Sequence, residues 1–281
     1  MVIHSIPEVL GGSGTAPVQV VDYHSTQELQ REKVNLQQHT ISFLREGTKE
    51  VYAGDHPVTI SPTHFLVMKA GHCLMTEKLS SEHQRYQSVL LFFSEEALAE
   101  IAARLFHRPG PPRPVAYVEA IPYDRYLETF VQSLLDLQGF DPAARTQLLR
   151  VKLEELLLYF RKTHGDDLLR FLLDTPDDRH QRFVRVVEHN RLDKLSLEEL
   201  AFLANMSVST FKREFRKHFG TSPSKWFLDQ RLERAAYLLS HGGKRPSDIY
   251  EAAGYENLSN FIQAFKGKFG VTPKQFQLAQ D

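Results

Sequence analysis

The sequence predicts an α+β protein of two domains, with a β-rich N-terminal part and an all-α C-terminal part. Segments rich in β-branched and aromatic residues fill the region from about residue 17 to residue 95, and segments with helical periodicity follow it. The charge changes along the same division, because residues 1–178 have a net charge of −7 and residues 179–281 a net charge of +6. The 281 residues suffice for two separate cores.

The N-terminal strands are expected where short apolar segments alternate with turn residues. Turns that contain Gly or Pro separate these segments, and several short strands at this spacing are typical of a small barrel or sandwich. The clearest strand segments are residues 39–44, 57–61, 64–70 and 87–93.

Helices are expected after these strands. Ser94 is a suitable N-cap for a first helix, and two longer helices are predicted at residues 123–138 and 142–163. Asp141 and Pro142 suit the cap and the first position of the last of these. That helix carries an apolar stripe, which packs against the protein's own strands, against a second copy of the chain, or against each along different parts of its length. The stripe consists of Leu149, Leu153, Leu156, Leu157 and Phe160.

The best linker candidate is the segment DTPDDRH, residues 174–180, which contains a proline and no apolar residue. The charge changes sign at the same point, so we expect one domain over residues 1–174 and another over residues 178–281. Either the charges have segregated by chance, or the C-terminal domain is built for a polyanion.

The C-terminal part repeats one pattern of phenylalanines. The segment FKREFRKHFGTSP at residues 211–223 returns as FIQAFKGKFGVTP at residues 261–273. On a helical wheel the phenylalanines of each copy form one apolar stripe, and the residues that differ between the copies lie opposite it. Gly220 and Gly270 are placed to end the two helices.

Each phenylalanine-striped helix follows a shorter predicted helix, at residues 196–204 and 247–255, and a short turn. Two helices joined by such a turn form a helix-turn-helix, in which the second helix enters the major groove of DNA. We therefore predict two helix-turn-helix units, at about residues 196–220 and 247–270, joined by a linker helix at residues 223–240. An α-solenoid is the alternative, but solenoids generally need three or more repeats.

This arrangement resembles the AraC/XylS family of bacterial transcription regulators. The resemblance covers roughly the last hundred residues and rests on the frame Ile249, Gly254-Tyr255, Phe261, Phe265, Phe269-Gly270 and Pro273. It implies an N-terminal cupin-like β-barrel with a helical dimerisation segment, and a homodimer formed through the helices of residues 123–163. It further implies sequence-specific binding to double-stranded promoter DNA, activation of transcription with RNA polymerase as a partner, and control by a small-molecule or protein effector.

The resemblance also implies roles for single residues, which fall on the exposed faces of the two phenylalanine-striped helices. Gln263 stands where the family often has a basic residue, and Gly267 weakens its helix by up to about 1 kcal/mol. The second unit is therefore expected to read less sequence, or to read DNA shape instead. Base-reading roles fall on Ser209, Lys212, Arg213, Ser259, Asn260 and Gln263, and phosphate contacts on Arg216, Lys217, Lys266 and Lys268.

The N-terminal domain offers weaker predictions. Tyr23, Arg45 and His72 are candidates to line a polar effector pocket, and Cys73 is either a redox sensor or a buried structural thiol. The alternative function is a metal-dependent cupin enzyme with a helical appendage. His39, His64, His72 and His83 lie in the strand region without a His-x-His pair, so we expect no catalytic metal, no cofactor and no enzyme activity.

The composition favours a cytoplasmic protein. A single cysteine excludes an intramolecular disulfide, and the N-terminal residues have no secretory signal pattern. The longest apolar runs are too short to span a bilayer, so no membrane association is expected.

Overall fold

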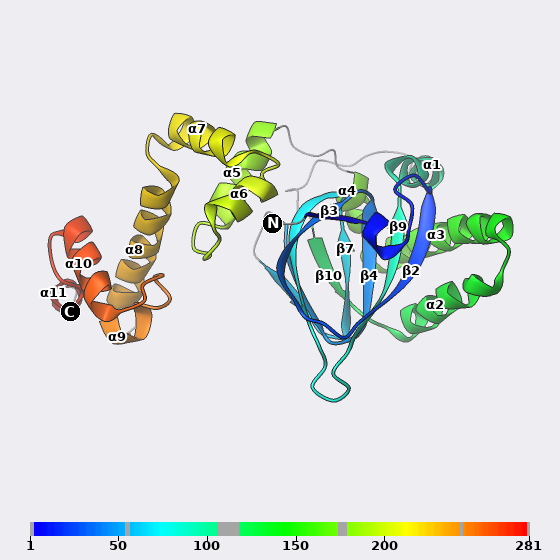
Figure 1. The fold of residues 1–281 in the computed structure, drawn as a ribbon, viewed down its shortest axis with the longest axis horizontal. Coiled ribbons are helices and arrows are strands. Elements are labelled where there is room, and N and C mark those ends of the chain that lie inside the picture. Colours follow the sequence, from blue (N-terminus) through cyan, green and yellow to red (C-terminus); the bar gives the residue numbers. More distant parts are fainter. Residues whose placement is uncertain (1–2, 54–56, 106–117, 174–178, 242–243, 280–281) are drawn as a thin grey trace. The chain divides into compact units, whose positions relative to one another are not determined.

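The computed structural model describes residues 3–53, 57–105, 118–173, 179–241 and 244–279 (Figure 1). The chain forms two compact units, a first unit of residues 1–182 with 202–205 and a second unit of residues 183–201 with 206–281. Of the expected linker at residues 174–180, only Arg179 and His180 lie inside the described residues, and they begin a helix. The coarse α+β prediction is confirmed, with strands confined to the first unit among the described residues.

The first unit contains two five-stranded sheets. One sheet has the order β1 (Ile3–Ile6), β3 (Leu29–Leu36), β8 (Gly71–Lys78), β5 (Thr48–Tyr52) and β6 (Val58–Ile60). The other has the order β10 (Val118–Pro122), β7 (His64–Met68), β4 (His39–Glu46), β9 (Tyr86–Phe93) and β2 (Val18–Ser25). The pairing is antiparallel except between β1 and β3. All four strand segments expected from the sequence are present, as β4, β6, β7 and β9, whereas β1 and β10 lie outside the region where strands were expected.

The second of these sheets has an apolar core on each face. In β9, Leu90 and Phe92 belong to a core shared with strands of the other sheet, while Leu91 and Phe93 belong to a core shared with helices. This division follows from the pleat, because successive side chains of a strand point to opposite faces. A strand with both faces covered lacks the polar alternation of a half-exposed strand, which explains why QSVLLFF is so apolar.

Four helices supply the second core, namely α1 (Glu95–Leu105), α2 (Arg125–Asp136), α3 (Pro142–His164) and α4 (Asp167–Leu173). Ser94 and Asp141 accept hydrogen bonds from the first turns of α1 and α3, as expected for N-caps. The apolar stripe of α3 is fully buried against this sheet, and the ring of Phe160 stacks on Phe65 at 5.8 Å. The stripe therefore stabilises the first unit itself.

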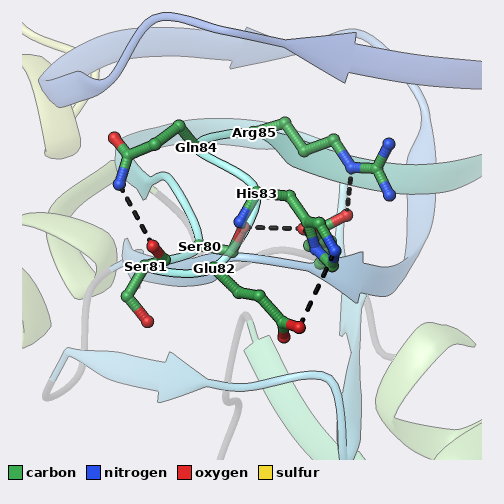
Figure 2. Close-up of polar contacts among 7 residues, drawn as sticks. Ser80, Ser81, Glu82, His83, Gln84 and Arg85 are labelled. Atoms are coloured by element: carbon green, nitrogen blue, oxygen red, sulfur yellow. Dashed lines mark hydrogen bonds and ion pairs between the residues drawn. The ribbon is translucent and has the colours of Figure 1, made fainter.

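The connection between β8 and β9 is held by a polar cluster around Glu46, at the end of β4. Figure 2 shows Ser80, His83 and Arg85 of this connection. Ser80 Oγ donates to Glu46 Oε1 at 2.7 Å, and His83 Nδ1 lies 2.8 Å from the same oxygen. Arg85 Nε donates to Glu46 Oε2 at 2.5 Å. Hydrogen bonds from Ser80, Arg85 and His83 together lower the pKa of Glu46 to about 2, so this carboxylate is charged at neutral pH.

The described part of the second unit is helical (Figure 1). The helix α5 was not expected, although its apolar residues at positions 183, 186 and 187 have helical spacing. The helix expected at residues 247–255 is shorter than predicted, because α9 ends at Ile249 and turns follow it. In chain order the helices are α5 (Arg179–His189), α6 (Leu197–Leu203), α7 (Val208–Phe219), α8 (Pro223–His241), α9 (Pro246–Ile249), α10 (Leu258–Phe269) and α11 (Pro273–Leu278).

Candidate nucleic-acid interface

Helix α7 is fixed on one side by aromatic packing. Phe211 and Phe215 are fully buried, and both pack against Phe183 of α5, with ring centroids 5.3 and 6.1 Å apart. Phe215 also contacts Phe227 of α8 at 5.8 Å. The predicted phenylalanine stripe is therefore the internal face of the helix, and its opposite face is left to solvent.

The ends of α7 are defined by local hydrogen bonds. Ser207 Oγ accepts from the Thr210 backbone nitrogen at 3.2 Å, as an N-cap does. Gly220 has the left-handed φ of 70° that ends a helix, and its nitrogen donates to the Arg216 carbonyl at 3.0 Å. The residues that set the length of α7 are thus adjacent to it in the sequence.

The exposed side of α7 borders a groove of about 750 Å³. Four cationic side chains of α7 line it together with the start of α8, and none of the described residues that line it is acidic. Such a concentration of positive charge, exposed on one helix, suits a phosphate backbone or guanine edges. The cations are Lys212, Arg213, Arg216 and Lys217, and the other residues are Ser222, which directly precedes α8, and Pro223 and Ser224 of α8. Ser209 is also exposed on α7.

Helix α10 repeats this construction. Phe261 and Phe265 are fully buried, Asn257 caps the helix by accepting from the Asn260 nitrogen at 2.9 Å, and Gly270 ends it with φ 78°. The preceding turn is one residue longer than in the first copy. In the first copy the Met206 nitrogen donates to the Ala201 carbonyl, and the cap Ser207 follows at once. In the second copy the Tyr255 nitrogen donates to the Tyr250 carbonyl, and Glu256 stands between Tyr255 and the cap Asn257.

The exposed face of α10 differs from that of α7. It carries Ser259, Asn260, Gln263 and Lys266, so Lys266 is the single cation among these four predicted contacts. Lys268, a fifth predicted contact, points elsewhere, because its Nζ bonds to the Asp229 carbonyl at 2.9 Å and to Glu233 Oε1 at 3.0 Å. Lys268 thus joins α10 to α8, and the structure gives its ammonium group partners other than DNA.

Helix α8 packs against α7 and against α9 and α10. Near the start of α8, the ring centroid of Trp226 lies 4.8 Å from that of Phe219 of α7. Farther along, Leu232, Ala235 and Leu239 share a core with Ile249 and Phe265. Gly254, in the second turn, has φ 88° and lies against the Arg231 side chain of α8, where an added Cβ would be 3.0 Å from Nε. The positive φ favours glycine there, and a larger residue would in addition require the Arg231 side chain to shift.

The three predicted effector residues do not meet in one place. Tyr23 packs against the core between the two sheets, while Arg45 is exposed and lines a separate cavity of about 270 Å³ beside α2. His72 is the second residue of β8, where Cys73, Met75 and Glu77 alternate toward the core and His72 points the other way. Sequence spacing alone does not show which face of a strand a residue occupies.

The described residues of the first unit give no sign of a metal centre, because no three His, Cys, Asp or Glu side chains among them are placed to hold an ion. Cys73 is 1% exposed, and burial raises its pKa to about 12, which favours the structural alternative over a redox sensor. None of the described helices is long and apolar enough to cross a membrane.

Two family profiles match the chain. Residues 200–279 match a helix-turn-helix domain, and residues 39–171 match an ExsA N-terminal regulatory domain. The first match contains α7, α8 and α10. The second contains most of both sheets, together with α1 to α3 and most of α4.

Several proteins with sequences similar to this chain are regulatory proteins. The thermoregulatory protein LcrF of Yersinia pestis is 34% identical over 152 residues, which is 53% of this chain and 54% of LcrF, so the match spans about half of that relative. The HTH-type transcriptional regulator ExsA of Pseudomonas aeruginosa is 25% identical over 85% of each chain. A solved structure of an apo ToxT variant from Vibrio cholerae matches with a TM-score of 0.43 and 13% identity, covering 94% of this chain and 98% of ToxT.

Proposed function

Because the chain belongs to the AraC/XylS family of bacterial transcription regulators, we propose that it binds double-stranded promoter DNA and activates transcription. The observation that carries this proposal is the groove beside α7, where four exposed cations line one side of a helix-turn-helix. Its positive charge suits DNA, and its position on the exposed face of α7 suits insertion into the major groove. RNA polymerase is the proposed partner in activation, and the cytoplasm the proposed location.

The proposed base contacts are divided between the two units. Arg213 and Lys212 suit guanine, and Asn260 and Gln263 suit adenine. Ser209 and Ser259 lie one residue after the first position of their helices, where recognition helices meet base edges. Arg216, Lys217 and Lys266 are proposed to contact phosphates. Lys268 is left out of this set because α8 carboxylate and carbonyl groups hold it.

The proposed domains are residues 1–174, which would receive a signal and dimerise, and residues 178–281, which would bind DNA. The two sheets of the first domain support a cupin-like barrel that takes a small-molecule or protein effector. The linker helix between the two DNA-binding units is α8, whose packing on both of them favours a fixed spacing. No cofactor is needed for any of these roles.

A homodimer is proposed through α2 and α3, but not through the buried stripe of α3. Val151 and Leu158 are 61% and 46% exposed, and they lie seven residues apart on the outer side of that helix. Residues at this spacing form one seam in helix pairs. Replacing both with glutamate should give a monomer in analytical ultracentrifugation, while Leu153→Glu should unfold the first unit instead.

The experiment that tests DNA binding begins with genome-wide mapping of the protein's sites in its bacterium of origin. A bound promoter fragment is then titrated with the purified full chain, using fluorescence anisotropy in the presence of excess nonspecific DNA. The variant with Lys212→Ala and Arg213→Ala should lose the preference for the fragment. Lys78→Ala, which removes an exposed lysine from the first unit, serves as the control. Equal affinity of the wild-type chain for the fragment and for unrelated DNA would contradict the proposal.

A further inference from the structure

A cavity of about 210 Å³ lies in the first unit, between strands of its two sheets. Val9, which is 56% exposed, stands at its rim, and Met75 and Glu77, each 3% exposed, stand at its floor. The cavity therefore reaches from the surface into the core. A cavity of about 150 Å³ admits benzene, so this one has room for a small organic molecule.

Most of the cavity wall is apolar. Ile6, Val34, Met75 and Leu90 contribute side chains from β1, β3, β8 and β9. Such a wall favours the apolar part of a ligand, since burial removes apolar surface from water, and a few polar groups then fix its orientation.

The polar groups of the floor are an ion pair that is almost completely buried. Lys49 Nζ donates to Glu77 Oε1 at 3.2 Å, with the two side chains 2% and 4% exposed. The Lys49 ammonium also lies 5.9 Å from the ring centre of Tyr86. Burial alone would lower the pKa of Lys49, but Tyr86 and Glu77 outweigh it and raise the pKa, so the lysine stays charged. Its charge is already matched by Glu77.

The second oxygen of Glu77 has no such partner. Glu77 Oε2 is buried and accepts no hydrogen bond of ordinary geometry from any described residue. Tyr23 also lines the cavity, and burial, the charge of the Glu77 carboxylate and a polar contact with that carboxylate all raise the Tyr23 pKa. That contact falls outside the distance and angle of an ordinary hydrogen bond, so it leaves Oε2 without a well-formed donor. A buried carboxylate oxygen without a donor is rare in folded proteins, and a bound ligand is one way to supply the donor.

We propose that this cavity binds a small, largely apolar molecule whose polar end is a hydrogen-bond donor, an amine or an alcohol, directed at Glu77 Oε2. A carboxylate is disfavoured because Lys49, the cation of the floor, is already engaged, and because Glu32 adds a second acidic group at the cavity. The inference deepens the proposed function, since it rests on the first unit being the part that receives a signal.

The test compares three probes that share one ring and differ at the polar end. Full-length protein is titrated with 2-phenylethylamine, 2-phenylethanol and phenylacetate in an isothermal titration calorimeter. We expect the amine and the alcohol each to bind at least tenfold more tightly than phenylacetate. The proposal is overturned if phenylacetate binds as tightly as either, or if none of the three binds.

Variants of the floor test the role of Glu77. In Glu77→Gln the amide oxygen must face Lys49, because the ammonium group can only donate hydrogen bonds. The amide NH₂ group then faces the cavity, so the tenfold preference for the amine and the alcohol over phenylacetate should disappear. Because this change leaves a buried lysine without a counter-ion, Lys49→Met combined with Glu77→Gln is the second variant, and it should also lose the preference. Glu50→Gln is the matched control, because Glu50 neighbours Lys49 on β5 and does not line the cavity. A preference kept in a folded Glu77 variant would overturn the proposal.

The same samples separate this inference from the proposed function. DNA affinity measured without any probe tests DNA binding alone, and probe affinity measured without DNA tests the cavity alone. If the amine binds through Glu77 but leaves the affinity for DNA unchanged, the cavity assignment stands and the sensing role of the first unit fails.

Discussion

In α7 the exposed face carries Lys212, Arg213, Arg216 and Lys217, whereas the exposed predicted contacts of α10 include the single cation Lys266. The buried faces of the two helices are nearly the same, with two fully buried phenylalanines each, a cap at one end and a left-handed glycine at the other. Packing within the protein determines the residues of the internal face, and this packing is similar for α7 and α10. Binding to a partner determines the residues of the exposed face, so the two helices need not bind DNA equally.

The neighbours of the two buried faces also differ in number. Phe215 contacts the rings of Phe183, Phe211, Phe219, Trp226 and Phe227, while Phe265 contacts those of Phe261, Phe269 and Phe276. Phe215 therefore has more aromatic neighbours than Phe265. Two of its neighbours, Trp226 and Phe227, belong to α8, whereas Phe276 beside Phe265 belongs to α11.

The largest effect is expected from removing one of these central rings. Phe215→Ala and Phe265→Ala should each lower the free energy of unfolding of the second unit by about 3–5 kcal/mol, with the greater loss at Phe215. Chemical denaturation followed by fluorescence measures this, because Trp226 is the protein's single tryptophan. If α8 couples the two helix-turn-helix units, Phe265→Ala also shifts the Trp226 transition. An unchanged transition would mean that the units unfold independently.

The next effect concerns base reading. Arg213→Ala should cost about 1–3 kcal/mol of discrimination between a promoter fragment and unrelated DNA, and Gln263→Ala should cost less. The reason is that Arg213 stands among four cations of one groove, while Gln263 is neutral and its helix has few cations. Anisotropy titrations of both variants on the same fragment decide the matter. The reverse order would refute the unequal roles of the two units.

A smaller effect is expected from the glycine inside α10. Gly267 is exposed, and a Cβ added there would meet no atom within 4 Å, so Gly267→Ala should stabilise the second unit by up to about 1 kcal/mol. Thermal unfolding measures the gain. The matched control is Gly270→Ala, which should be destabilising because Gly270 has φ 78°. If Gly267→Ala also strengthens DNA binding, the glycine is part of the inequality between the two helices.

The smallest effect distinguishes two lysines near the ends of the helices. Lys217→Ala should reduce the salt dependence of DNA binding by about one unit of slope in log Kd against log salt. Lys268→Ala should leave that slope unchanged and lower stability by about 0.2–1 kcal/mol, because Lys268 bonds to α8. A reduced slope for Lys268→Ala would show that its ammonium reaches DNA despite those bonds.

Much of the second unit could be predicted from the sequence because its signals are local. The phenylalanine spacing, the caps and the terminal glycines each involve residues within one or two turns of one another, and they place α7 and α10 correctly. The helix α5 was missed although its spacing was visible, and the helix at residues 247–255 was drawn too long. Tyr250 to Gly254 lie in turns, and the left-handed Gly254 packs against Arg231 of another helix.

In the first unit, four strands and three helices followed from composition and periodicity, but the roles of their side chains did not. The stripe of α3 suited either the protein's own sheet or a second copy, and its burial against Phe65 settles where it packs. Tyr23 and Arg45, grouped as pocket candidates, belong to different cavities. Period-two alternation assigns a strand its two faces, but it does not say which element covers each face.

The sequence by itself determined the repeated helices, their ends and the division of each into an internal and an exposed face, because hydrogen bonds and periodicity act over a few residues. Only the tertiary structure decided that Lys268 bonds to α8, that the α3 stripe is internal and that Glu77 keeps an unpaired oxygen at a cavity. The first two depend on side chains that are more than thirty residues apart in the sequence. The third depends on the lack of a hydrogen-bond donor beside Glu77. Local sequence patterns do not show which distant groups meet.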